Sequence, residues 1–487
     1  MIIRPALDEV RRLSPGNTVV PVSMEIFSDV KTSIEILRSI RSKYKHFYML
    51  ESVESGDSWG RYSFLGYDPS LAVTGRDGLV RMENGRSQEI RTGNPTAILK
   101  EILSGYKSPR LPGLPHFTGG FVGYFSYDYI KYTEKSLHLG ADNAEGFDDF
   151  SLMLFDKVIA FDHYRQKIFL IVNVRTEDLE NNYVAAVARL KDMEQLILGA
   201  AAPAEAASGV TSGFTAAFTR EQYCGMVERA KHYITEGDIF QVVPSNRFTA
   251  DFKGDLLQTY RVLRTLNPSP YMFFLSGAGL QIAGASPETL VSLKDGVVST
   301  YPLAGTCPRG KDDQEDKALT DALLQNEKEL AEHDMLVDLG RNDLGKICRF
   351  GTVRVEEYRK IKRFSHVSHI ASKVTGRIRE DKDAFDAIAA ALPAGTLSGA
   401  PKLRACEIID ELEGKKRGIY GGAVGYIDFT GNMDFCIGIR MAALKDGKVY
   451  VQSGGGVVAD SEPEKEYRET LNKAGAIIEA LNASGEV

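Results

Sequence analysis

Cysteine is scarce in this sequence. The five cysteines of the 487-residue chain lie far apart, at Cys224, Cys307, Cys348, Cys406 and Cys436. This spacing excludes a CxxC metal or redox pair and also a disulfide framework. Isolated cysteines are typical of free thiols in a reducing compartment, and we therefore expect a cytoplasmic protein.

Long hydrophobic runs are also missing. No apolar run reaches the ~18 residues that a membrane-spanning helix needs, and the stretch Phe169–Val174 is interrupted by Asn173. The first residues, MIIRPALDEVRRL, contain acidic side chains and no apolar signal core. We expect neither a membrane anchor nor a secretory signal.

An excess of positive charge is absent as well. Lys and Arg number 59 against 66 Asp and Glu, and the net charge of −7 argues against a protein that binds nucleic acid over its whole surface. Neither a GxxxxGK[ST] loop nor a strand–GxGxxG–helix unit is present, which disfavours the nucleotide-binding folds.

The chain that remains has two long parts separated by a segment of unusual composition. Residues 199–213, GAAAPAEAASGVTSG, predict a flexible linker or surface loop between residues 1–198 and 214–487. Strands and helices cluster rather than alternate, which favours an α/β protein of the α+β type with mixed or antiparallel sheets. The clearest predicted helices are 33–41, 183–196, 219–236, 327–339 and 464–481, and the clearest predicted strands are 45–50, 62–65, 119–125, 158–162, 167–174, 240–243, 271–275, 279–283, 289–293, 421–428 and 448–452.

Two acidic pairs lie on predicted helices. Glu329 and Glu332 are spaced i,i+3, as are Glu466 and Glu469, and Lys473 lies one turn beyond Glu469. An exposed acidic face is the simpler interpretation of each pair. Facing each other, they would instead suit Mg²⁺, which takes one or two carboxylates, and the lysine would offer an anionic ligand a point charge.

Other segments carry residues suited to an anionic ligand. The run SGGG at Ser453–Gly456 permits close backbone approach, and YPLAGTCPRG at Tyr301–Gly310 predicts an irregular loop that exposes Thr306. His366 and His369 lie in a predicted extended segment, and Arg440 lies in an apolar strand-like run. A plain turn, a structural histidine and an internal ion pair are the alternatives. Together the residues describe a pocket for a small dianion, and without phosphate-binding loops a carboxylic acid is the expected substrate.

These residues lie within a longer set of ordered strings that resembles the chorismate-utilising enzymes, and among them the large subunits of anthranilate synthase. The resemblance covers most of the second half of the chain and is thinner in the first, where it is mainly LES at Leu50–Ser52. The strings are GDIFQVVPS (Gly237–Ser245), NPSPYM (Asn267–Met272), GASPETLV (Gly284–Val291), PLAGT (Pro302–Thr306), KELAEHDMLVDLGRNDLG (Lys328–Gly345), SHVSH (Ser365–His369), PAGTLSGAPK (Pro393–Lys402), RGIYGGAVGY (Arg417–Tyr426) and VADSEPEKEYRETLNKA (Val458–Ala474).

The resemblance implies large antiparallel sheets packed face to face and flanked by helices, with the catalytic domain at 214–487. It implies that Mg²⁺ is held by Glu332 and Glu469, with Glu329 and Glu466 beside them, and that Thr306 and His369 act near the departing groups. The substrate-binding residues that it implies are Gly305, Thr306, Tyr420, Arg440, Gly454, Gly455, Gly456 and Lys473.

Two positions favour one activity within this family. Gln241 stands where isochorismate- and salicylate-forming members have a lysine that activates water, so ammonia is the expected nucleophile. Ala304 stands where aminodeoxychorismate synthases usually have a lysine that attacks the ring. Cys307 and Gly455 depart from the common Arg and Ala. An aminodeoxychorismate synthase and a non-catalytic subunit of the same fold remain the alternatives.

The resemblance also implies partners and regulation. The chain lacks the GxCxG nucleophile motif of glutamine amidotransferases, so we expect a separate amidotransferase subunit to supply ammonia. The family binds tryptophan between its two lobes as a feedback inhibitor. The matching residues here are Glu51, Ser52, Pro270, Tyr271 and Met272.

Overall fold

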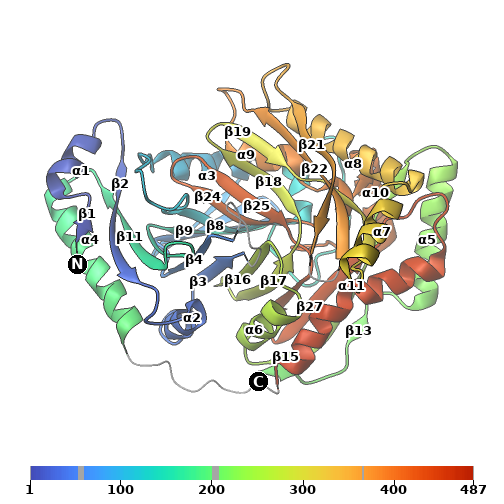
Figure 1. Cartoon of the computed structure of the whole chain (residues 1–487), viewed down its shortest axis with the longest axis horizontal. Coiled ribbons are helices and arrows are strands. Elements are labelled where there is room, and N and C mark those ends of the chain that lie inside the picture. The colour runs from blue at the N-terminus through green and yellow to red at the C-terminus, as the bar shows by residue number, and fades with distance from the viewer. Residues whose placement is uncertain (1, 53–59, 200–207, 365–366, 486–487) are drawn as a thin grey trace.

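The computed structural model describes residues 2–52, 60–199, 208–364 and 367–485. His366 and residues 200–207 of the predicted linker lie outside these ranges. The described chain forms two large sheets with helices on their outer faces (Figure 1). None of the described helices is both long and apolar enough to cross a membrane.

The larger sheet contains 13 described strands, and every pairing in it is antiparallel. In spatial order it runs β1 (Ile3–Arg4), β2 (Val19–Phe27), β11 (Lys167–Arg175), β10 (Lys157–Asp162), β4 (Tyr62–Tyr67), β3 (Phe47–Glu51), β16 (Tyr271–Gly277), β17 (Leu280–Ser286), β26 (Met441–Lys445), β27 (Lys448–Gly454), β15 (Ser245–Lys253) and β12 (Gly209–Val210), while β13 (Thr215–Ala216) also pairs with β15.

The second sheet contains 12 described strands and is antiparallel throughout as well. Its order is β20 (Leu303–Pro308), β22 (Val367–Arg377), β19 (Val297–Thr300), β18 (Thr289–Lys294), β25 (Met433–Ile437), β24 (Ala423–Asp428), β8 (Gly120–Phe125), β9 (Phe150–Phe155), β5 (Leu71–Arg76), β6 (Leu79–Glu83) and β7 (Ser87–Arg91), with β21 (Arg354–Arg363) paired to β22. A short ladder joins β14 (Gln241–Val242) to β23 (Gly399–Ala400).

Both large sheets contain strands from the two halves of the chain. In the larger sheet β3 pairs with β16, and Glu51 lies opposite Met272. In the second sheet β8 pairs with β24, and Phe125 lies opposite Ala423. The segments before and after residues 199–213 therefore share two continuous hydrogen-bonded layers.

The helices cover the outer faces of the sheets. They are α1 (Leu7–Leu13), α2 (Ser33–Arg41), α3 (Pro95–Ser104), η1 (Tyr127–Tyr132), α4 (Leu179–Leu198), α5 (Arg220–Thr235), α6 (Leu257–Leu266), α7 (Asp313–Leu323), α8 (Glu327–Gly345), α9 (Ala384–Ala391), η2 (Gly395–Leu397), α10 (Lys402–Glu413) and α11 (Pro463–Ala483). In Figure 1, α8 and α11 lie on the right side of the molecule, with β22 and β27 close to them.

Strand β16 shows why the strands have nearly continuous apolar sequences. Met272 and Phe274 point into the core beneath the helices, whereas Phe273 and Leu275 point into the core between the two sheets. Successive side chains of a strand alternate between its faces, and a sheet covered on both faces needs apolar residues at every position.

Candidate active site

The acidic residues of α8 and α11 lie near one another. Helix α8 begins after Asn326, whose side chain accepts hydrogen bonds from the Lys328 and Glu329 amides. Burial raises the pKa of Glu329, and the neighbouring Glu332 and Glu469 raise it further. Burial and Glu469 likewise raise the pKa of Glu466. Carboxylates of the two helices therefore share one electrostatic environment.

These carboxylates fit a divalent ion that needs few protein ligands. Oε2 of Glu466 is buried without a hydrogen-bond partner among the described residues. Lys473 Nζ lies 2.6 Å from Glu469 Oε1, and Glu332 Oε1 accepts a 3.0 Å hydrogen bond from Gln241 Nε2. Within the described ranges, no group of three or more His, Cys, Asp or Glu side chains is arranged to hold a metal ion by itself. Mg²⁺ needs only one or two protein carboxylates together with water and an anionic ligand, so this arrangement suits it.

The glycine run after β27 lies directly against these groups. A Cβ atom on Gly455 would lie 2.7 Å from Glu466 Oε2, and one on Gly456 would lie 2.6 Å from Gln241 Nε2. Alanine at position 455, common in the family, would therefore require Glu466 to move. The absence of side chains brings the backbone of this run to the edge of the acidic group.

Arg440 does not lie in a strand, contrary to the sequence-based prediction. It falls between β25 and β26, in the left-handed region with φ 48°. Its guanidinium makes no hydrogen bond or ion pair with another described residue, and burial lowers its pKa. A partly buried cation without a partner in the described part of the chain favours an anionic ligand.

Tyr420 lies next to the glycine run. A Cβ atom on Gly454 would lie 3.1 Å from the Tyr420 hydroxyl, and burial raises the pKa of that hydroxyl. Lys473 Nζ donates a 3.0 Å hydrogen bond to the Gly454 carbonyl. Tyr420 and Lys473 therefore both lie against Gly454.

The segment around Thr306 is a strand with a bulge rather than the irregular loop that the sequence predicts. In β20 the pairing with β22 shifts between Ala304 and Thr306, and Gly305 takes φ +70°, which suits glycine. Thr306 is exposed as expected. The bulge places Thr306 Oγ1 and the Gly305 carbonyl each 3.0 Å from His369 Nδ1.

His369 is poised as a neutral base. Burial lowers its pKa, and the positive charges of Arg440 and Lys473 lower it further, against the effect of the Gly305 carbonyl. With its Nδ1–H donated to that carbonyl, Nε2 retains a lone pair. This places His369 in the electrostatic field of both predicted carboxylate-binding cations.

Glu288 is a functional candidate that the sequence analysis did not single out, although it lies within GASPETLV. Burial raises its pKa to about 8, against opposing effects of Thr396, Lys473 and the Leu303 backbone. Thr396 Oγ1 donates a 3.2 Å hydrogen bond to Glu288 Oε1. A carboxyl group that stays protonated at neutral pH can act as an acid.

The five predicted tryptophan-site residues all line one cavity of about 440 Å³ between the two sheets. Ser52 Oγ is buried there without a hydrogen-bond partner in the described part of the chain. Glu51 is already engaged, because it accepts a 2.6 Å hydrogen bond from the Tyr260 hydroxyl and pairs with Arg264. Asp434, whose pKa burial raises to about 7, is a second carboxyl of the same cavity.

The site contains Arg440, carboxylates from two helices and a run of glycines, on a framework of antiparallel sheets. The match of the sequence to a family model agrees with these features. Residues 46–479 match the model described as chorismate binding enzyme, and the chain belongs to this family. The prediction of the family from the sequence is confirmed, and so is the predicted fold class.

Individual relatives narrow the comparison. "Anthranilate synthase component 1" of Acetivibrio thermocellus is 46% identical over 99% of both chains, and that of Pseudomonas aeruginosa is 44% identical over 97% of both. The crystal structure of anthranilate synthase component I from Streptococcus pneumoniae superposes with a TM-score of 0.75 at 37% identity, covering 93% of this chain and 99% of that one.

Proposed function

We propose that this chain converts chorismate and ammonia to anthranilate and pyruvate, as the large subunit of an anthranilate synthase. The observation that carries the proposal is the Arg440 guanidinium, which has no hydrogen-bond or ion-pair partner among the described residues. Its charge, like that of Lys473, lowers the pKa of His369. Chorismate has two carboxylates, and two separate cations suit a dianion of that kind. The names of the relatives support the same reaction.

Each carboxylate of the substrate has its own set of donors in this proposal. The enolpyruvyl carboxylate meets Arg440, the Tyr420 hydroxyl and the backbone of Gly454–Gly456. The ring carboxylate lies near Lys473. This division orients the ring so that its reacting carbons face the acidic and basic side chains.

Mg²⁺ completes the charge balance in this proposal. Glu332 and Glu469 would hold it, with Glu329 and Glu466 beside them. When bound, it supplies positive charge that neutralises the ring carboxylate and limits its movement. Burial raises the pKa of Glu329 and the charges of Glu332 and Glu469 raise it further, and a cation beside these carboxylates would relieve their repulsion.

The proposal includes two proton transfers. Ammonia adds at C2 while the C4 hydroxyl leaves as water, and protonated Glu288 gives that hydroxyl its proton. In the second half, the C2 proton is removed and the C3–O bond breaks, so the ring becomes aromatic and the side chain leaves as enolpyruvate, which takes up a proton to become pyruvate. Neutral His369, held by Gly305, takes the C2 proton, and Thr306 keeps the imidazole in place.

The choice of nucleophile depends on Gln241. Its side chain is buried, donates to Glu332 and leaves Oε1 without a partner among the described residues. An amide cannot deprotonate water, whereas an unpaired acceptor suits N–H donors such as ammonia. Ala304 likewise offers no nucleophile for the covalent route of an aminodeoxychorismate synthase.

A partner subunit and an inhibitor complete the proposal. An amidotransferase subunit supplies ammonia from glutamine, because the sequence has no glutaminase nucleophile motif of its own. L-Tryptophan binds in the cavity lined by Ser52 and Met272 and inhibits turnover. A cavity of about 440 Å³ lies within the usual size range for small ligands.

The test is direct turnover by the purified chain. Chorismate, Mg²⁺ and an ammonium salt at about pH 8.5 should yield fluorescent anthranilate and one pyruvate for each anthranilate. An amino product without pyruvate would indicate the aminodeoxychorismate alternative. Binding of chorismate with no Mg²⁺-dependent product would indicate a non-catalytic subunit.

A further inference from the structure

A buried ion pair lies behind the proposed substrate site and is not itself part of it. Arg417 is 2% exposed and Glu413, at the end of α10, is 6% exposed. The Arg417 Nε donates to Glu413 Oε2 over 3.0 Å. Such a pair is costly to desolvate and is retained where its geometry is fully used.

Arg417 joins two backbone segments in addition to its partner. Nη1 donates a 2.6 Å hydrogen bond to the Leu397 carbonyl, and Nη2 donates a 2.5 Å hydrogen bond to the Val243 carbonyl. Val243 is two residues from Gln241, and Leu397 follows Thr396, the hydrogen-bond donor to Glu288. One guanidinium therefore fixes both the segment that carries Gln241 and the segment whose Thr396 contacts Glu288.

Glu413 extends the same arrangement to the glycine run. Its Oε1 accepts hydrogen bonds from the backbone amide and the hydroxyl of Ser245, at 2.8 and 2.9 Å. Ser245 lies directly opposite Gly454 in the β15–β27 ladder. The carboxylate thus fixes the strand against which the glycine run is paired.

Tyr420 is the third site residue attached to this pair. The guanidinium carbon of Arg417 lies 5.6 Å from the centre of the Tyr420 ring, and two residues lie between them in the sequence. A planar guanidinium near an aromatic ring restricts how that ring can move.

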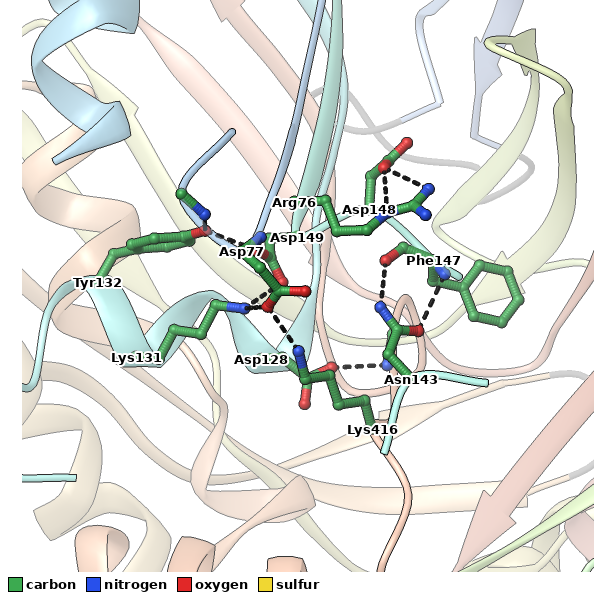
Figure 2. A network of polar contacts seen from close by, with 12 residues as sticks. Arg76, Asp77, Asp128, Lys131, Tyr132, Asn143, Phe147, Asp148, Asp149 and Lys416 are labelled. Carbon is green, nitrogen blue, oxygen red and sulfur yellow. Dashed lines mark hydrogen bonds and ion pairs between the residues drawn. The ribbon is translucent and has the colours of Figure 1, made fainter. Parts of the chain in front are cut away.

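The neighbouring residues hold the same segment to the first half of the chain. Figure 2 shows Lys416 and Lys131 both reaching Asp77, at 2.7 and 2.8 Å. The Gly418 amide donates a 2.8 Å hydrogen bond to Asp128. These contacts anchor the segment outside the site, whereas the Arg417 side chain connects it to Leu397, Val243 and Glu413.

We propose that Arg417, together with Glu413, is a positioning residue that sets the geometry of Tyr420 and the Gly454–Gly456 backbone for substrate binding. The inference rests on the proposed function, since it assigns these groups to the enolpyruvyl carboxylate. Lysine at position 417 keeps the charge but loses the fork that serves a carboxylate and two carbonyls together. The substrate-binding groups are then left less ordered.

The experiment is a double-mutant cycle on chorismate binding. Arg417→Lys and Tyr420→Phe should each raise the dissociation constant of chorismate, by about ten-fold for the first. The dissociation constant of the combined variant should not exceed that of the single variant that binds chorismate more weakly, because both changes disable the same contact. Additive losses in a protein that still makes anthranilate would overturn the inference.

A neighbouring residue supplies the matched control. Lys416→Met removes the ion pair with Asp77 and should lower the melting temperature without changing the dissociation constant of chorismate. If Arg417→Lys does not fold, Glu413→Gln, which keeps the shape of the pair, replaces it in the cycle with the same expectations. Parent protein that binds chorismate but forms no anthranilate would contradict the proposed function while leaving the cycle readable.

Discussion

Replacement of Glu288 by glutamine is the most revealing perturbation of the proposed chemistry. Glutamine has nearly the same shape and can still accept the hydrogen bond from Thr396, but it has no proton to give to the leaving hydroxyl. Loss of a general acid usually costs about 10²- to 10⁴-fold in rate. We expect kcat to fall within that range, while the dissociation constant of chorismate changes little because Glu288 is not a proposed carboxylate-binding group.

The pH dependence of the unaltered protein supplies the magnitude. With a pKa of about 8, Glu288 is about 90% protonated at pH 7 and about 10% protonated at pH 9. The rate should therefore decline above pH 8, with the free NH₃ concentration held constant by adjusting total ammonium. In the Gln variant this decline should disappear.

Stability gives an independent measurement of the same group. Glu288 binds its proton in the folded protein up to about pH 8, whereas its ordinary pKa is 4.5, so folding stability falls as pH rises between these values. At about 1.4 kcal/mol per pKa unit, the loss is on the order of 4 to 5 kcal/mol. Denaturant unfolding of the Gln variant should show a correspondingly flatter pH dependence. A variant with unchanged kcat, or a parent rate that does not decline above pH 8, would refute the assignment.

Four further predictions concern other residues of the proposed active site and of the cavity proposed to bind tryptophan. His369→Ala should let the amino intermediate accumulate and slow anthranilate release by about 10²-fold or more, as product chromatography would show; full anthranilate output would contradict its role as base. Gln241→Lys should divert turnover from ammonia to water, detected as a hydroxylated product formed without ammonium. Arg440→Gln should raise KM for chorismate on the order of 100-fold, because a charge-assisted contact is lost; a KM within two-fold of the parent would contradict the carboxylate site. Ser52→Ala should raise the tryptophan concentration for half-inhibition about three- to ten-fold, the effect of one hydrogen bond, and an unchanged inhibition curve would exclude its hydroxyl from the inhibitor site.

Local patterns in the sequence predicted many of the elements closely. The helix predicted at 33–41 is α2, which begins with a capping box between Thr32 and Glu35. The prediction for α8 stopped at Leu339 because Gly340 and the polar residues after it are poor helix signals. The helix continues to Gly345, since Leu344 is buried against the sheet.

Long-range arrangement was not readable in the same way. Nothing local indicates that Glu51 lies opposite Met272, because strand pairing between distant segments depends on the whole sheet. The resemblance assigns Arg440 and Thr306 to the site, which stays a prediction, whereas the backbone predicted for each of them is wrong. A left-handed residue after β25 and a bulge at Gly305 are responses to packing that periodicity does not reveal.

Glu288 shows which part of the site's chemistry cannot be predicted from the sequence. A glutamate in GASPETLV has no special proton affinity on its own. Its raised pKa arises from burial among segments as far apart as Leu303 and Thr396. Residue type is therefore readable from the sequence, whereas the state of its proton is a property of the assembled fold.

The pairing of β3 with β16 and of β8 with β24 has a consequence for engineering. Cutting the gene between the halves would leave each product with two bare, hydrophobic strand edges in water, a condition that promotes aggregation. Deleting the first half to remove the proposed tryptophan site should therefore yield insoluble protein. Point substitutions in the cavity proposed to bind tryptophan are the route that preserves a foldable chain.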